Sequence, residues 1–174
     1  AIGGVVAAVT FVAQPAFAAD PKLPETMAWS AYDVGSSGYN QSVAIGSAFK
    51  NKYGVNLRVI PGKNDVSRML PLKTDRLDFV MNGVGTYMGQ EGLYEFGAKD
   101  WGPMPLRILL TNISGQAATM IVAGDIGVKT VADLKGKRVS WVIGAPALNQ
   151  NITAVLAFAG LTWDDVQKVE FGGY

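Results

Sequence analysis

The chain has 174 residues, of which 49% are hydrophobic and 17% charged, and its formal net charge is +1. Soluble domains usually carry about a quarter charged residues, so this chain is apolar for its size, and its near-neutral charge offers no basic surface for a nucleic acid. Cysteine and histidine are absent, which excludes Cys–His and Ser–His–Asp nucleophiles, Cys/His zinc sites and thiol redox pairs. The composition therefore favours a binding protein over an enzyme, and we expect no cofactor and no metal.

The first 18 residues have the pattern of a secretory signal. An uncharged apolar run, AIGGVVAAVTFVA, precedes the small-x-small sequence Ala16-Phe17-Ala18. About a dozen apolar residues ahead of such a sequence are typical of a signal peptide and are too short to span a bilayer. We expect a partial signal peptide over residues 1–18, cleavage near Ala18 and a periplasmic mature protein, with a buried apolar helix as the alternative. Because the last residues indicate a strand entering a glycine turn, we interpret the chain as an N-terminal fragment.

Strand and helix patterns alternate along the remaining chain. The strands predicted from short apolar or alternating segments are 27–32, 55–60, 77–81, 106–110, 119–122, 138–143 and 169–171. The helices predicted from apolar spacing and capping residues are 45–53 (ended by Gly54), 65–73 (kinked or ended by Pro71), 130–134 and 148–159. Thr130 and Thr162 each have the spacing of a capping box, with an aspartate three residues later. This alternation predicts βαβ units and a mostly parallel sheet. We expect an α/β fold in which residues 19–112 form a first lobe and 113–174 form a crossover and the start of a truncated second lobe.

Ligands of such folds lie beyond the carboxyl ends of the strands, so the loops that follow the strands are the candidate site. Small residues and hydroxyls at a helix start favour an anion, although a plain turn with a capping serine explains the first loop equally well. Lys63 or Arg68 is placed to balance a carboxylate, and a solvated cation is the alternative. The candidate substrate-binding residues are Ser36, Ser37, Gly38, Tyr39, Asn40, Lys63, Asn64, Asn82, Gly83, Tyr87, Ala145, Pro146, Asn149 and Gln150.

Several of these segments resemble a known class of proteins. Residues 126–139, IGVKTVADLKGKRV, resemble a segment of type II periplasmic binding proteins. Together with the early Ser-Gly-Tyr loop, the Gly-x-Pro loop at 144–146 and AGLTWDDV at 159–166, the set resembles the TAXI family, the solute receptors of TRAP transporters. One departure is Ala147-Leu148-Asn149-Gln150, where that family usually carries hydroxyl residues.

The resemblance implies a two-lobed Venus flytrap, the type II periplasmic binding protein fold, with its second lobe incomplete in this chain. It further implies capture of a small organic anion (an amino acid or dicarboxylate) by hinge closure, and delivery to a TRAP membrane permease. One alternative is an ABC-transporter binding protein for a sulfonate or a thiamine or pyrimidine precursor. Others are an exported ligand sensor and an exported enzyme on this fold, against which the absence of His and Cys argues.

Overall fold

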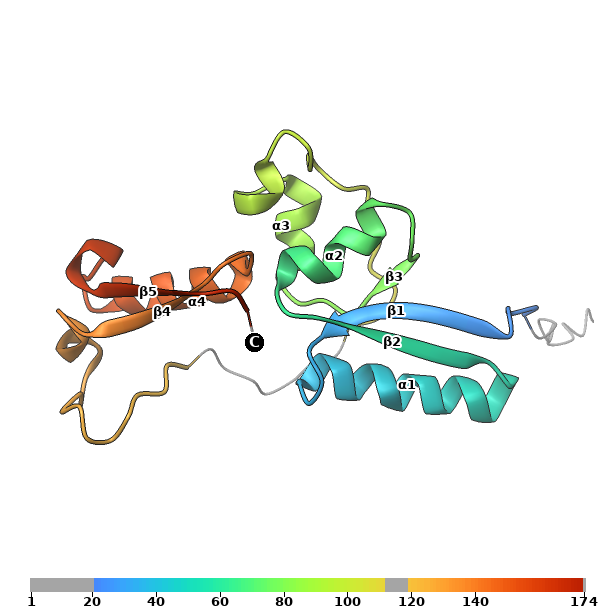
Figure 1. Ribbon diagram of the computed structural model, residues 1–174, viewed down its shortest axis with the longest axis horizontal. Helices are drawn as coiled ribbons and strands as arrows, with labels where there is room; N and C mark the ends of the chain where they lie inside the picture. Colours follow the sequence, from blue (N-terminus) through green and yellow to red (C-terminus); the bar gives the residue numbers. More distant parts are fainter. Residues whose placement is uncertain (1–20, 112–118, 174) are drawn as a thin grey trace, which may run out of the picture.

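The computed structural model describes residues 21–111 and 119–173, and the predicted signal peptide lies outside these residues. The described residues form two groups of elements, which we call the first and second lobes (Figure 1). The first lobe contains β1 (Thr26–Tyr32), α1 (Ser37–Tyr53), β2 (Asn56–Gly62), α2 (Asp65–Lys73), β3 (Phe79–Val80), α3 (Gly85–Glu91) and the 3-10 helix η1 (Tyr94–Gly97). The second contains the 3-10 helix η2 (Val131–Leu134), β4 (Arg138–Val142), α4 (Pro146–Phe158), the 3-10 helix η3 (Trp163–Asp165) and β5 (Gln167–Phe171).

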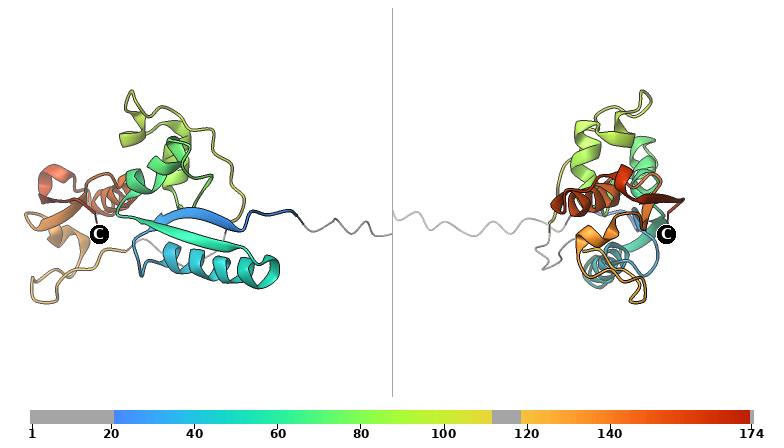
Figure 2. Two further views of the ribbon diagram at one scale, coloured as in Figure 1. Left: turned by 45° about the vertical axis from the view of Figure 1, so that its right-hand side comes forward. Right: turned by 90° about the vertical axis from the view of Figure 1, so that its left-hand side faces the viewer.

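The three strands of the first lobe form a parallel sheet in the order β2-β1-β3. In its register Thr26 lies opposite Asn56 and Tyr32 opposite Gly62. Helix α1 covers one face of this sheet, and α2 and α3 lie on the other (Figures 1 and 2). Since all three strands run in one direction, their carboxyl ends share one edge, as the sequence predicted.

The core of the first lobe is built on the α2–α3 side of the sheet. Its buried residues include Met69, Met88, Phe96 and Met104, with Phe96 and Met69 fully buried. Ala147 of the second lobe packs into this same cluster. One hydrophobic core therefore already joins the two lobes before any polar contact is considered.

The second lobe has a smaller sheet, in which β4 and β5 pair in parallel. Its core consists of Leu134, Val139, Leu156 and Val166. The two predicted capping boxes are present, one at Thr130 and one at Thr162, and each begins a single short 3-10 helix. The mostly parallel α/β architecture predicted from the alternation of elements is confirmed in both lobes.

Several predicted boundaries change in the structure. Helix α1 begins eight residues before its first predicted position and ends, as predicted, at Gly54, whose φ of 72° lies in the left-handed region. Helix α2 continues two residues past Pro71, whose ring falls in the last turn. The loop at 82–87 contains the start of an unpredicted helix, α3.

The predicted strands at 106–110 and 119–122 are wrong for this structure. Both segments are described and neither is a strand. Ile108, Leu109 and Leu110 are 68–76% exposed, and Ile121 is 90% exposed. An apolar alternation becomes a strand only when another strand supplies the hydrogen bonds, and none of the described strands pairs with these two segments.

Candidate functional site

The loops predicted to bind a ligand follow the carboxyl ends of β1, β2 and β3 and therefore lie at one edge of the first sheet. The start of α1 reaches the end of β3, because a Cβ at Gly38 would lie 3.3 Å from Cγ of Met81. Ser36 caps α1 by accepting a hydrogen bond from the N–H of Tyr39 (3.2 Å). The exposed Ser37 hydroxyl accepts a hydrogen bond from the Gln41 side chain (3.2 Å). This corner offers hydroxyls and the first amides of a long helix, a combination that suits an anion.

The second lobe meets this edge through the loop between β4 and α4. The side-chain amide of Asn64 donates to the Ile143 carbonyl (3.2 Å), and the N–H of Val66 donates to the Gly144 carbonyl (3.0 Å). The residues after β5 come to the same place, since a Cβ at Gly173 would lie 2.7 Å from the Lys63 carbonyl oxygen. The carboxyl edges of both sheets thus meet at one place, which we call the junction.

A buried carboxylate lies at the junction. Asp65 is 0% exposed; its Oδ1 accepts hydrogen bonds from the Tyr32 hydroxyl (3.0 Å) and from Nη2 of Arg68 (2.5 Å). Its Oδ2 accepts the N–H of Ala147 (2.9 Å), in the first turn of α4. The carboxylate therefore receives donors from both lobes and is balanced by the buried guanidinium of Arg68.

Arg68 is held on several sides. Its Nη1 donates to the Met81 carbonyl (3.1 Å), and its guanidinium carbon lies 3.8 Å from the centroid of the Tyr32 ring. The residue is 4% exposed, and its Nε has no hydrogen-bond partner among the described residues. Because Asp65 already neutralises it, Arg68 is not the free cation that the sequence prediction allowed. Lys63, at the end of β2, is exposed and remains a candidate for that role.

The structure brings some of the candidate residues to the junction. Lys63, Asn64, Ala145 and Pro146 lie there, although Ala145 and Pro146 are fully buried. Asn64 serves mainly as the cap of α2, in a reciprocal capping box with Ser67. The contacts of these residues are structural, and their part in binding stays a prediction.

The side chains of two other candidates, Asn149 and Asn82, make contacts within the fold. Asn149 is 1% exposed, and both of its amide atoms bond the backbone of Val142, at 2.9 Å each, so its side chain fastens α4 to the end of β4. The Asn82 side chain accepts the N–H of Gly83 (3.0 Å) and points its amide at the Met69 sulfur (3.0 Å).

Three further candidates lie on helices and are exposed or half-buried. Tyr87, on α3, is 60% exposed, Gln150 is half-buried on α4, and Asn40 is exposed on α1, where its amide donates to the Gly35 carbonyl (3.4 Å). These three side chains therefore keep polar groups available to a ligand.

Sequence reasoning missed Asp65 and Tyr32. An aspartate at the first position of a helix is so common that it indicates only a helix start. Tyr32, the last residue of β1, fits an ordinary apolar strand. No local pattern shows that these side chains would meet, because they are 33 residues apart along the chain.

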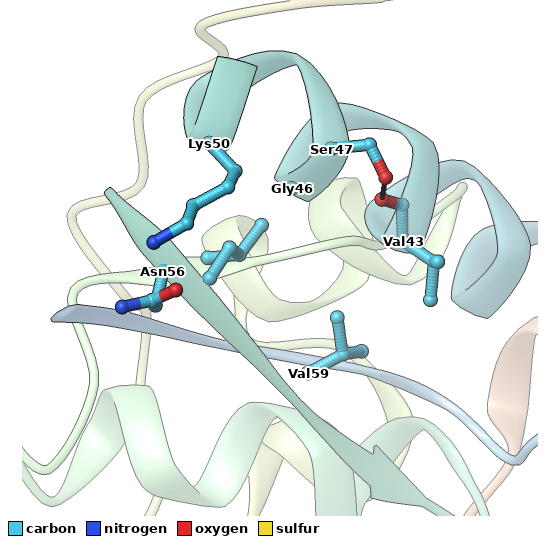
Figure 3. A pocket seen from close by; sticks show the side chains of 7 residues that line it. Val43, Gly46, Ser47, Lys50, Asn56 and Val59 are labelled. Atoms are coloured by element: carbon cyan, nitrogen blue, oxygen red, sulfur yellow. Dashed lines mark hydrogen bonds between the residues drawn. The ribbon is translucent and has the colours of Figure 1, made fainter. Parts of the chain in front are cut away.

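Two hollows in the described part of the chain lie away from the junction. One, of about 270 Å³, lies between α1 and β2 near the amino ends of the strands (Figure 3), and its lining residues are Val43, Gly46, Ser47, Lys50, Asn56, Leu57 and Val59. The other, of about 330 Å³, is lined by Val131, Asn151, Ala154, Val155 and Phe158. Neither contains a candidate residue, and the first lies at the end of the sheet opposite to the one where ligands of α/β folds bind.

The described residues bring no three His, Cys, Asp or Glu side chains together as a metal site. Within the same residues no helix has the length and apolar character needed to cross a bilayer.

Comparisons with known proteins agree with this architecture. The family described as NMT1/THI5 like matches residues 43–174. The structure is similar to the alkanesulfonate-binding protein SsuA from Xanthomonas axonopodis pv. citri bound to MOPS, with a TM-score of 0.52, 13% identity, and coverage of 87% of this chain and 49% of that one. It is also similar to the periplasmic aliphatic sulphonate binding protein SsuA from Escherichia coli, with a TM-score of 0.54, 17% identity, and coverage of 86% and 48%. No curated protein matches the chain by sequence.

These matches confirm the predicted fold. The chain has the α/β fold of type II periplasmic binding proteins and spans about half the length of the solved structures it resembles. None of the three matches is a TAXI receptor, so they support the superfamily and not that finer assignment.

Proposed function

The chain belongs to the NMT1/THI5-like family, and on that premise we propose that it is part of an extracytoplasmic solute-binding protein of an ABC transporter. The proposed solute is an alkanesulfonate, a small organic anion. A thiamine or pyrimidine precursor is the alternative. The protein captures the solute between its lobes and passes it to a membrane permease without transforming it.

The observation that carries this proposal is the meeting of the two parallel sheets at their carboxyl edges. In α/β folds ligands bind at such edges, where several loops and helix starts converge. Here the convergence joins two lobes, so a ligand that contacts both would favour the closed arrangement over the open one by its differential affinity. The likeness to two sulfonate-binding proteins supports a sulfonate in preference to the dicarboxylate expected from the sequence.

The chemistry of the first lobe fits an anion. The hydroxyls of Ser36 and Ser37 and the first amides of α1 are donors, and the exposed ammonium of Lys63 supplies charge. A helix N-terminus stabilises an anion through its free N–H groups and its dipole. We propose that these groups bind the charged end of the solute, while the β4–α4 loop covers it from the other lobe.

Thermal unfolding of the full-length protein tests the proposal against a panel of alkanesulfonates, pyrimidine precursors, dicarboxylates and amino acids. A true ligand at a hundred times its dissociation constant adds about 2.7 kcal/mol to the free energy of unfolding. A response confined to sulfonates or pyrimidines supports the proposal. A response confined to dicarboxylates or amino acids would instead favour the TAXI interpretation and its TRAP permease.

A pair of double variants locates the site. Ser37→Ala with Lys63→Ala removes a hydroxyl and a cation at the junction edge, and should weaken binding at least tenfold, since a hydrogen bond to a charged group is worth about 1.5–3 kcal/mol. The control is Ser47→Ala with Lys52→Ala, which makes the same changes in the half of α1 distant from the junction. Equal affinity in the two double variants would place the solute elsewhere.

A further inference from the structure

The two lobes share one buried ionised group. Asp65 starts α2 in the first lobe, and its carboxylate accepts the N–H of Ala147 in the first turn of α4 at 2.9 Å. That N–H belongs to one of the first helical residues, which have no partner within their own helix. The first lobe therefore supplies the acceptor that the second lobe's helix lacks.

Two neighbouring hydrogen bonds join the same segments, from Asn64 to Ile143 and from Val66 to Gly144. Both are bonds between neutral groups, whereas the Asp65 bond has an ionised acceptor. Hydrogen bonds to ionised groups are roughly twice as strong as neutral ones. Of these three bonds across the junction, the one from Asp65 is thus expected to contribute most.

Both charged groups are buried, Asp65 being 0% and Arg68 4% exposed. Their charges are not hydrated and therefore depend on protein partners for stabilisation. Separation of the lobes would remove the Ala147 donor and admit water to the carboxylate, while the pairs with Arg68 and Tyr32 lie within the first lobe and would remain. The carboxylate therefore has a docked state, in which it accepts the Ala147 N–H, and a released state, in which it does not.

The docked state also fills the junction. Gly144, Ala145 and Pro146 are buried, the Gly144 carbonyl accepts the N–H of Val66 in α2, and neither hollow described above lies there. The carboxylate occupies the start of α4, where an anionic ligand would otherwise find free N–H groups. A solute that needs this space must first displace Asp65 from Ala147.

We propose that Asp65 is a latch that holds the empty site shut by occupying the start of α4 from the first lobe. The inference rests on the proposed function, because the latch regulates the site of that solute. Breaking the latch should increase the population of separated lobes about tenfold, the equivalent of one hydrogen bond to an ionised group. It should also tighten solute binding by a similar factor, because a larger fraction of the protein then has the lobes separated and the site accessible to the solute.

The test measures the separation of the lobes in the full-length protein without ligand. This chain has no cysteine, so Asn51→Cys on α1 and Ala157→Cys on α4, both exposed, introduce two label positions for a distance measurement. Asp65→Asn removes the charge and should lengthen the mean distance. Tyr32→Phe is the matched control, because it removes a donor to the same carboxylate from within the first lobe and should leave the distance unchanged.

A second variant covers the case in which Asp65→Asn does not fold because Arg68 is left without its counter-ion. Asp65→Leu combined with Arg68→Met removes the buried pair together, a change that is often neutral or stabilising. It also removes the acceptor for Ala147, so it should separate the lobes in the same way.

The outcomes are distinguishable. An unchanged distance in the folded variants overturns the latch, and so does a longer distance accompanied by weaker binding of the alkanesulfonate. If no solute binds wild type or variant, the proposed function fails, and the distance alone still decides whether the latch holds the lobes together.

Discussion

Asn149 gives the sharpest test of whether a candidate residue binds a ligand or holds the fold. Its Oδ1 accepts the N–H of Val142, and its Nδ2 donates to the Val142 carbonyl, both at 2.9 Å. In a parallel pair successive N–H groups face opposite edges of the strand. The N–H of Ile143 donates to Phe171 of β5, so the N–H of Val142 faces the other edge, where Asn149 supplies its acceptor.

Asn149→Ala should therefore destabilise the protein. The part-buried Val142 N–H is left without an acceptor, which costs about 1–3 kcal/mol. The Val142 carbonyl keeps the Ala145 N–H (3.1 Å) as a donor, so loss of the second bond adds only about 0.5–1.5 kcal/mol. The expected decrease in the free energy of unfolding is thus about 2–4 kcal/mol.

Urea unfolding of the full-length protein measures this decrease as a lower midpoint at unchanged slope. Asn151→Ala is the control, because it makes the same substitution at an exposed position of the same helix and should change stability by less than about 0.5 kcal/mol. If Asn149→Ala left stability unaltered while weakening solute binding, the assignment of this side chain to the fold would be refuted and the sequence prediction of a binding role restored.

Three further predictions concern the lobes separately. Phe96→Ala removes a fully buried ring from the core of the first lobe and should cost about 3–5 kcal/mol in urea unfolding. Gly62→Ala would place a Cβ 2.8 Å from Cβ and 2.9 Å from the backbone nitrogen of Arg68, so it should destabilise by about 1–3 kcal/mol, and an unaffected midpoint would contradict this packing. In the second lobe, the pKa of Asp133 lies below its ordinary value because the carboxylate accepts hydrogen bonds, foremost from the backbone N–H of Lys129 and then from the backbone N–H and hydroxyl of Thr130. Its contribution to stability is present above the unfolded pKa and is lost as pH falls through the lower folded value, so Asp133→Asn should flatten the loss of stability below about pH 5. An equally steep loss in that variant would assign the acid sensitivity to other groups.

Measuring the distance between the lobes of the latch variants in the presence of each solute of the panel tests the two proposals together. If Asp65→Asn separates the lobes and a sulfonate closes them again, one measurement of distance reports both the latch and the ligand. The label positions are the same in both experiments, so the two results are directly comparable.

Short-range patterns determined most of the secondary structure from the sequence alone. The first helix ends at Gly54, as predicted, because glycine adopts the left-handed backbone conformation of a helix C-cap with little steric strain. The capping boxes at Thr130 and Thr162 formed, because each needs only a residue three positions away. The alternation of strands and helices predicted the parallel sheets, and with them the edge at which a site would lie.

Tertiary structure decided what the individual side chains at that edge do. The partner of Asp65 in the second lobe is Ala147, 82 residues away, so no local pattern distinguishes this aspartate from an ordinary helix start. Asn149 has a side chain that commonly contacts ligands. It is a structural residue because α4 packs beside β4 and both of its amide atoms bond the Val142 backbone. The apolar residues at 106–110 form no strand, because a strand exists only where a neighbouring one supplies its hydrogen bonds. Sequence fixes which groups a segment can offer, and the packing of distant segments decides which of those groups are already used and which stay free for a ligand.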